Sequence, residues 1–533
     1  MLTRREFLLG ATGLTGLSGC GRPRAAPPGA LVNDVQSQLN ATRVDRVVNA
    51  DSIDALRAAV RRARADGRSV SVAGGRHAMG GQQFGTDAIH VDTTPLNRVL
   101  GFDRDRGHIE VGAGMQWPEL IDYLWRVQAG ESRPWAIVQK QTGADRLSIG
   151  GALSANVHGR GLTFRPVIQD VEAFTLVDAS GDVYTCSRHE NPELFRLAIG
   201  GYGLFGLIAS VTLRLRPRQK IERVVDVIDL DDLALSFDSR IRAGFVYGDF
   251  QYSTDATSTD FLRKGVFSCY RPIEDSASMR AQQRELSGDD WRRLLYLSHA
   301  DKKRAFVEYS SYYLTTTGQR YWSDTHQLSY YVDNYHQALD RQLGASAPAT
   351  EMITEIYVPR FALARFMKDV GSGFGEHRAS VIYGTIRLIE RDDESFLAWA
   401  RQSWACVIFN LHVVHTPEGI ARATGAFRQL IDFALRHGGS YYLTYHRWAT
   451  RRQVEACYPQ FGAFLRLKRT YDPAERFQSD WYRHYRAMFA DVLQTSPANP
   501  SIAPSARSQS GFTRVHSTSA LVAPVRAEAT QPV

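Results

Sequence analysis

Glycine clusters that follow short strand-like runs constrain the fold of this chain more than any other feature of its sequence. Residues 69–73 read as a short strand and open into Gly-Gly-Arg-His-Ala-Met-Gly-Gly-Gln at 74–82. Further glycine clusters occupy 112–114, 150–151 and 200–206. Glycine lets the backbone turn sharply and approach another group closely. Short strands that alternate with such turns, with only one or two helices between them, predict an α+β fold.

Regular elements can be placed around these clusters. Helical spacing of apolar residues predicts helices over 51–66, 117–128 and 192–198. Residues 170–185 alternate between apolar and polar side chains as a hairpin does, and 207–215 read as a further strand.

The glycine run at 200–206 contains the spacing G-x-G-x-x-G, at Gly201, Gly203 and Gly206. A dinucleotide-binding fingerprint requires a strand, then the glycines, then a helix, so that the phosphate meets the helix N-terminus. Here the predicted order is helix, glycines, strand. The run is therefore not expected to be a Rossmann site.

The character of the sequence changes in its second half. Aromatic runs at 245–252 and 307–313 read as strands and alternate with polar helices such as 276–297. Strand character returns at 441–445, and a helical, arginine-rich end follows. A second domain is therefore expected between two parts of the first.

The two ends read as segments outside the fold. Arg4 and Arg5 precede a short apolar stretch, as in a Tat-type export signal, and the run that ends at Cys20 resembles a bacterial lipoprotein box. The chain is therefore expected to be exported and held at a periplasmic or cell-surface membrane by lipid on Cys20. The predicted organisation is a signal at 1–20, a tether at 21–39, a first domain at 40–217, a second domain at 218–439, a return to the first at 440–490 and a disordered tail at 491–533.

Composition excludes several classes of function. Hydrophobic residues make up 44% of the chain, yet after the signal no segment approaches the run of about 20 apolar residues that a membrane helix needs. The net charge is +8, but basic and acidic residues are interspersed, so nucleic acid is not an expected partner. The five cysteines form no CxxC pair, and those after Cys20 are expected to be buried thiols. His412 and His415, three apart in a strand-like run, would point to opposite faces, so no metal site is expected.

The loop at 74–82 carries the clearest chemical signal. Its glycines allow backbone N–H groups to surround an anion such as a pyrophosphate. A histidine, His77, stands inside the loop, although a phosphate cradle does not need one. Glycine loops are common, so the residues alone leave open whether this one binds phosphate.

Four motifs in order resemble the FAD-linked oxidases related to vanillyl-alcohol oxidase, with their PCMH-type FAD-binding domain. Several members, among them the alditol oxidases, read G-x-R-H as residues 74–77 do, and cytokinin dehydrogenases place Gln five residues after the histidine, as Gln82 is here. Residues 142–161 contain a turn similar to the family's GG-x-L-S and a His-Gly pair like that of sugar-lactone and decaprenylphosphoryl-ribose oxidases. Residues 191–208 and 471–480 are similar to the third and fourth motifs.

The resemblance implies a two-lobed FAD-binding domain with an inserted α+β substrate domain. It also implies FAD bonded covalently to His77, as in members that carry this histidine. Carried over by position, the FAD-binding residues would be Gly74, Gly75, Arg76, His77, Ala78, Gln82, Gly143, Ser148, Gly151, Ser154, Asn156, His158 and Ile208.

The acid or base of these relatives is not retained. The aspartate of cytokinin dehydrogenases would fall near residues 142–143, which hold no acid, and the glutamate of alditol oxidases is replaced by Thr385, two residues before Arg387. Oxidation of a C–H beside a hydroxyl needs a hydride acceptor and a group that takes the hydroxyl proton. Tyr445, His446 and Arg387 are the candidates for substrate contact.

The expected function is therefore an FAD-dependent oxidoreductase that acts on a CH–OH substrate such as an alcohol, polyol, sugar or lactone. Electrons would pass to oxygen, a quinone or a periplasmic carrier. Two alternatives stay open. One is a flavin dehydrogenase that acts on a CH–NH substrate, and the other is a non-catalytic ligand-binding lipoprotein on the same fold.

Overall fold

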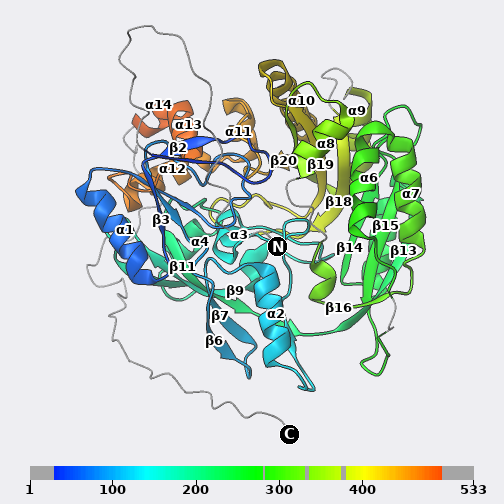
Figure 1. The fold of residues 1–533 in the computed structure, drawn as a ribbon, viewed down its shortest axis with the longest axis horizontal. Helices are drawn as coiled ribbons and strands as arrows, with labels where there is room; N and C mark the ends of the chain where they lie inside the picture. Colours follow the sequence, from blue (N-terminus) through cyan, green and yellow to red (C-terminus); the bar gives the residue numbers. More distant parts are fainter. Residues whose placement is uncertain (1–28, 280–282, 330–334, 374–379, 495–533) are drawn as a thin grey trace, which may run out of the picture.

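The structure is a computed structural model, and it describes residues 29–279, 283–329, 335–373 and 380–494. The predicted export signal, Cys20 and most of the predicted tail lie outside the described residues. The described part mixes helices and sheets, as the α+β prediction requires (Figure 1). No described helix is long and apolar enough to cross a membrane.

A three-stranded parallel sheet positions the glycine loop. Its order is β3 (Arg46–Asn49), β5 (Ile89–Asp92), β4 (Val70–Ala73), and α1 (Ile53–Ala65) makes the crossover. The predicted helix at 51–66 is thus confirmed, and the Ser52 side chain caps it by accepting a hydrogen bond from Ala55 N–H. Because β4 ends at Ala73, the loop at 74–82 leaves from the carboxyl edge of the sheet.

A five-stranded antiparallel sheet packs beside the first. Its order is β10 (Val183–Ser187), β9 (Val171–Val177), β11 (Leu207–Arg214), β7 (His108–Gly112), β6 (Val99–Asp103). The predicted hairpin and final strand are confirmed, as are the predicted helices, now α2 (Trp117–Val127) and α4 (Pro192–Ala198). The order α4, glycines, β11 also confirms that the G-x-G-x-x-G run lacks Rossmann context.

Two small sheets complete the first half. The strand β1 (Ala30–Val32) pairs with β2 (Thr42–Val44), and β8 (Trp135–Ala136) pairs with β12 (Arg216–Pro217). The strand β1 thus lies inside the predicted tether at 21–39. The short helix α3 (Ile149–Ala155) holds the GG turn.

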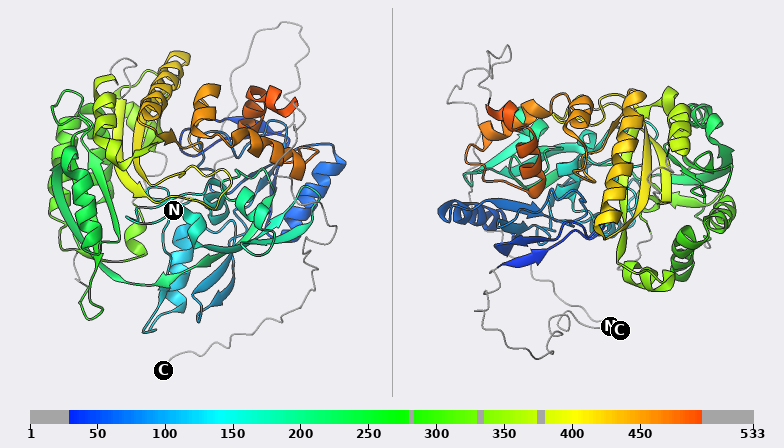
Figure 2. Two further views of the ribbon diagram at one scale, coloured as in Figure 1. Left: turned by 180° about the vertical axis from the view of Figure 1, so that it is seen from behind. Right: turned by 90° about the horizontal axis from the view of Figure 1, so that it is seen from above.

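An eight-stranded antiparallel sheet dominates the second half. Its order is β16 (Arg320–Trp322), β13 (Lys220–Asp229), β15 (Lys264–Pro272), β14 (Tyr247–Tyr252), β18 (Ser380–Ile389), β19 (Trp404–Val414), β17 (Ala349–Pro359), β20 (Ser440–Tyr441). The helices α5 (Leu233–Arg242), α9 (Leu363–Gly373) and α10 (Pro417–Arg436) pack on an apolar face, where Phe237 meets Phe267 edge to face and Phe366 meets Phe409. The opposite face is polar, and α6 (Gly288–Ala300), α7 (Lys302–Leu314) and α8 (Tyr335–Leu343) flank it (Figures 1 and 2).

Two predicted elements in this region need correction. Residues 307–313 form no strand but lie inside α7, which Asp301 caps. One cavity is lined by Phe306, Tyr309 and Tyr313, which recur at helical spacing. The sequence prediction missed this spacing because aromatic residues are so frequent in the segment. The helix predicted over 276–297 begins only at Gly288, after a capping box formed by Ser287.

The end of the chain returns to the first sheet. After α11 (Arg451–Cys457) and α12 (Phe461–Tyr471), residues 476–478 lie beside β4: Val70 N–H donates to Arg476 O (2.7 Å) and Gln478 N–H donates to Val70 O (2.9 Å). The helices α13 (Asp480–Met488) and α14 (Ala490–Gln494) follow, next to the N-terminal strands in Figure 1. Residues 491–494, predicted as tail, therefore belong to a helix.

A fully buried ion pair fixes this return. The Lys468 ammonium pairs with the Asp472 carboxylate, whose oxygens also accept from the backbone N–H groups of Arg476 and Phe477. A buried charge that loses its partner is costly, by roughly 3–5 kcal/mol.

We expect Asp472→Ala to lower the free energy of unfolding by about that amount, roughly 3–5 kcal/mol, because it leaves Lys468 unpaired. The exposed pair Arg126–Asp122 provides the control, since Asp122→Ala should cost no more than about 1 kcal/mol. Urea unfolding of both variants measures the difference, and equal losses would contradict the assignment.

Candidate active site

One large cavity lies between the glycine loop and the polar face of the eight-stranded sheet. Its volume is about 940 Å³. One wall is built by residues 74–79, by α3 and by Ile208 of β11. The opposite wall is built by β14, β17, β18 and β19, and the aromatic face of α7 closes one side.

The glycine loop packs directly on the segment before α3. A Cβ at Gly74 would overlap Ser148 Oγ, and a Cβ at Gly75 would overlap the Arg146 carbonyl oxygen. Ser148 itself caps α3 by accepting a hydrogen bond from Gly151 N–H. The sequence therefore needs glycine at 74 and 75 to bring two backbone segments together at the cavity wall.

His77 lies on the cavity wall and is half-buried. Burial, together with the nearby positive charges of Arg146 and Arg76, lowers the pKa of His77 to about 4. The imidazole is therefore neutral at pH 7 and keeps a nitrogen lone pair. A neutral imidazole can act as a nucleophile.

Most of the other residues predicted to bind the cofactor also line the cavity. Those residues are Gly74, Gly75, Arg76, Ala78, Gln82, Gly143, Ser148, Gly151, Ser154 and Ile208. Gln82 has a structural role as well, because its Nε2 donates to Leu443 O and Thr444 O, both at 2.9 Å. Gln82 thereby fixes the segment before Tyr445 against the glycine loop.

Asn156 and His158 lie behind the cavity rather than among its described lining residues. The Asn156 side chain donates to Asp392 Oδ2 (2.9 Å) and accepts from Ile168 N–H. These two hydrogen bonds engage both the nitrogen and the oxygen of its side-chain amide. Asn156 ends α3 in a left-handed conformation (φ 51°). The structure thus gives Asn156 a role in holding the chain, and His158 contacts a residue of the cavity wall.

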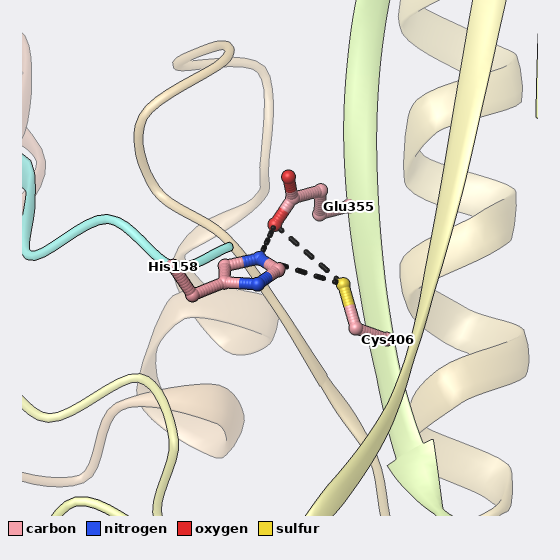
Figure 3. Close-up of side chains that lie close together, drawn as sticks. All are labelled: His158, Glu355 and Cys406. Carbon is pink, nitrogen blue, oxygen red and sulfur yellow. Dashed lines mark hydrogen bonds and ion pairs between the residues drawn. The ribbon is translucent and has the colours of Figure 1, made fainter. Parts of the chain in front are cut away.

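That residue is Glu355 of β17, which sequence reasoning missed. Its carboxylate contacts His158 Nε2 at 2.9 Å and accepts hydrogen bonds from Tyr357 Oη (2.9 Å) and Tyr445 Oη (2.8 Å). Cys406 Sγ lies 3.7 Å away (Figure 3). His158 Nδ1 is 3.1 Å from the Gly159 carbonyl oxygen, which can only accept, so Nε2 carries a further proton towards Glu355.

Electrostatics keep Glu355 ionised. Burial alone would raise its pKa, but His158, the positive charge of Arg387 and the hydrogen bond from Tyr445 together lower the pKa to about 2. Burial and the adjacent Glu355 charge hold the pKa of Tyr445 well above its usual value. The site therefore presents a carboxylate beside a neutral phenol, whose oxygen also accepts from Gln141 Nε2 (3.1 Å).

Strand register explains how these groups converge. Thr385, Ile408 and Glu355 lie in one row across β18, β19 and β17, and Arg387 lies in the next row with Cys406. The carboxylate absent at Thr385 is thus present two strands away, on the same face. The sequence signal for it was weak, because β17 carries two acids, Glu351 and Glu355, among apolar residues and threonines.

His446, the third predicted contact, points away from the cavity. Its ring lies 4.5 Å from that of Phe427 in α10 and is also stacked with Tyr441 and Trp448. Successive side chains diverge here, so Tyr445 faces the cavity and His446 faces the helical layer. Burial lowers the pKa of His446 to about 3.

The comparisons with known proteins agree with this geometry. Residues 44–187 match the family described as an FAD binding domain. This part of the chain is therefore similar to the FAD-binding domain of the PCMH-type FAD oxidases. It is 29% identical over 192 residues to D-arabinono-1,4-lactone oxidase of Yarrowia lipolytica, 31% over 162 residues to cytokinin dehydrogenase 3 of rice (Oryza sativa subsp. japonica) and 26% over 191 residues to L-gulonolactone oxidase of Bos taurus.

These matches are partial. They span 35%, 29% and 36% of this chain, and 35%, 29% and 42% of the respective relatives. They support an FAD-binding domain in the first half of the chain. The glycine cradle, the cavity between two walls and the neutral His77 fit FAD.

Buried His446 should make the protein sensitive to acid. Its folded-state pKa of about 3 lies below the value of 6.5 for the unfolded chain, so below pH 6.5 the unfolded state binds a proton that the folded state does not. Its contribution to stability is complete above pH 6.5 and falls by up to about 1.4 kcal/mol per pH unit towards pH 3.

We expect the free energy of unfolding of His446→Phe, which keeps an aromatic ring, to fall less than that of wild type between pH 6 and pH 4. The difference should be about 2 kcal/mol. Urea unfolding at the two pH values measures this difference. Substitution of the exposed His189 by Gln should leave the acid sensitivity unchanged. An unchanged slope in His446→Phe would show that other groups cause the acid sensitivity.

Proposed function

We propose that this protein is an FAD-dependent oxidoreductase that oxidises a CH–OH group of a polar substrate such as an alcohol, polyol, sugar or lactone. The observation that carries the proposal is Glu355, a buried carboxylate that faces the glycine loop across the cavity. FAD, when bound, supplies the hydride acceptor.

His77 would hold FAD covalently. Its neutral imidazole, with the pKa lowered to about 4, lies on the cavity wall between the two glycine pairs of the loop. The resemblance of residues 74–77 to G-x-R-H supports the same bond. A covalent link would retain the cofactor in a protein that works outside the cytoplasm.

Glu355 would accept the hydroxyl proton of the substrate. As the hydride leaves the carbon, the O–H proton passes to the Glu355 carboxylate and the substrate becomes a carbonyl compound. His158 stabilises this carboxylate from behind, and Tyr445 donates a hydrogen bond to it from the cavity side. Arg387, on the same wall, would orient or polarise the substrate oxygen.

The cavity wall favours a hydroxyl-rich substrate. Six lining residues carry buried polar atoms without a partner in the described part of the chain: Gln83 Oε1, Arg160 Nε, Gln251 Oε1, both ring nitrogens of His326, Arg387 Nε and Asn410 Oδ1. Such atoms are costly unless a ligand satisfies them. The cavity is also lined by Arg160, Arg223, Arg387 and Lys302, which disfavour a cationic amine and so weigh against the CH–NH alternative.

The domain organisation of the chain and its location in the cell are part of the same proposal. The first and last parts of the chain would form a two-lobed FAD-binding domain, and residues 218–439 an inserted substrate domain that roofs the flavin. The N-terminal arginine pair and Cys20 support export by Tat and a lipid anchor in the periplasm or at the cell surface. Oxygen, a quinone or a periplasmic carrier would reoxidise the flavin.

Covalent attachment has a direct test. After acid denaturation, the wild-type band should keep yellow flavin fluorescence, and the His77→Ala band should lose it. His189→Ala, at an exposed position, should keep it. Flavin released from the wild type would refute the covalent bond but not FAD binding, whereas a protein that binds no flavin would favour the ligand-binding alternative.

The role of Glu355 can be measured separately. With the best substrate from a panel of polyols, sugars and lactones, Glu355→Gln should slow anaerobic flavin reduction by about 10²–10⁴-fold, because the proton acceptor is removed. Glu390→Gln removes a carboxylate that pairs with Arg360 outside the cavity and should reduce flavin at the wild-type rate. Equal rates in all three proteins would assign the proton to another group.

A further inference from the structure

Three histidines converge on a second buried glutamate, Glu351 of β17. His412 is its cross-strand partner on β19, and the His412 Nδ1 to Glu351 Oε1 distance is 3.5 Å. His299 Nε2, from α6, lies 2.9 Å from Oε1, and His336 Nδ1, from α8, lies 3.0 Å from Oε2. The ligand atoms of His299, Glu351 and His412 all lie within 4.8 Å of one another.

The orientation of His299 directs one ring nitrogen at Glu351. Its Nδ1 is 2.9 Å from the Leu295 carbonyl oxygen, which can only accept, so Nδ1 carries a proton. Nε2 faces the Glu351 carboxylate at 2.9 Å, where it can hold either a second proton, as in His158, or a metal ion. A hydrogen bond from the second ring nitrogen to a backbone carbonyl is the arrangement that orients metal-binding histidines.

The other two imidazoles also approach without forming ordinary hydrogen bonds. His336 Nδ1 and His412 Nδ1 are buried atoms that lack a hydrogen-bond partner within the described residues, although both lie close to Glu351. The side chain of His336 is only 9% exposed and that of Glu351 only 1%. The nitrogens therefore face the carboxylate in a space from which water is largely excluded.

The buried Glu351 carboxylate needs a compensating positive charge, which either a proton on one imidazole or a bound cation would supply.

We propose that His299, Glu351 and His412 bind one divalent first-row transition-metal ion, with Zn²⁺ as the best match. Imidazole and carboxylate ligands suit this class of ion. A tetrahedral Zn²⁺ with metal–ligand distances of about 2.0–2.1 Å requires ligand atoms roughly 3.4 Å apart, close to the separations of 2.9 and 3.5 Å between Glu351 Oε1 and the two histidine nitrogens. Three protein ligands leave one position of a tetrahedral shell for a water molecule.

The metal would connect two layers of the second half. Glu351 and His412 belong to the eight-stranded sheet, and His299 belongs to α6. Ser298, next to His299, lines the cavity, while the three ligands stand behind it. The ion would thus fix α6 against the sheet and hold that end of the cavity wall in place.

The expectation that His412 and His415 lie on opposite faces of their strand is met. His412 faces Glu351, whereas His415 Nε2 lies 2.9 Å from Thr350 Oγ1 on the other side. Sequence spacing gave no metal signal, because the other ligands come from residues 299 and 351, far from His412 in the chain.

The test uses the flavin-loaded full chain. The protein is treated with a chelator, dialysed against Zn²⁺ and analysed for bound metal by mass spectrometry. We expect about one Zn²⁺ per chain, a higher melting temperature than the chelated protein, and visible d–d absorption bands when Co²⁺ replaces Zn²⁺. His299→Ala and His412→Ala should each weaken Zn²⁺ binding at least 10- to 100-fold.

The control is His437→Ala, which removes a histidine that pairs with one carboxylate, Asp369, at 2.9 Å. It should bind Zn²⁺ as the wild type does. Wild-type protein that takes up neither Zn²⁺ nor Co²⁺ would overturn the proposal and assign the cluster to protonated histidines. Full metal binding by His299→Ala and His412→Ala would overturn it too. The Co²⁺ spectrum of the wild type decides the question even if a variant fails to fold.

Discussion

The buried negative charge of Glu355 is the constraint on which the arrangement of the cavity depends. A carboxylate can be buried only where enough donors and positive charge surround it. Here the partners come from three distant parts of the chain: His158 follows α3, Tyr357 and Arg387 belong to the large sheet, and Tyr445 lies where the chain leaves that sheet. One ionised group therefore ties the FAD-binding half to the sheet opposite it.

The two walls of the cavity are held by different means. On the glycine side, backbone packs on backbone, and the amide of Gln82 fixes the segment that carries Tyr445. On the sheet side, strand register sets which polar groups share a face, so Gln251, Arg387 and Glu355 all point the same way. The rigid, hydrogen-bonded sheet thus presents the polar groups, and the glycine loop provides close approach.

Local patterns predicted much of the first half correctly. The helix α1, the hairpin formed by β9 and β10, and the glycine loop after β4 all depend on neighbours in sequence, and all were predicted. Glu355 was not, because it became a candidate only once register across β17, β19 and β18 aligned it with Thr385. The strand predicted over 307–313 failed for the opposite reason: its aromatic residues satisfied a local β preference, but the cap at Asp301 and the cavity they line require a helix.

The pairing of residues 476–478 with Val70 has a consequence for the order in which the protein is made. β4 precedes the glycine loop, yet the backbone groups that complete its edge are synthesised about 400 residues later. Contacts between such distant parts of a chain form slowly and late in folding. A ribosome must therefore release nearly the whole sequence before the first sheet can close. Any cofactor that occupies the glycine loop is then bound by the finished polypeptide, not by the nascent one.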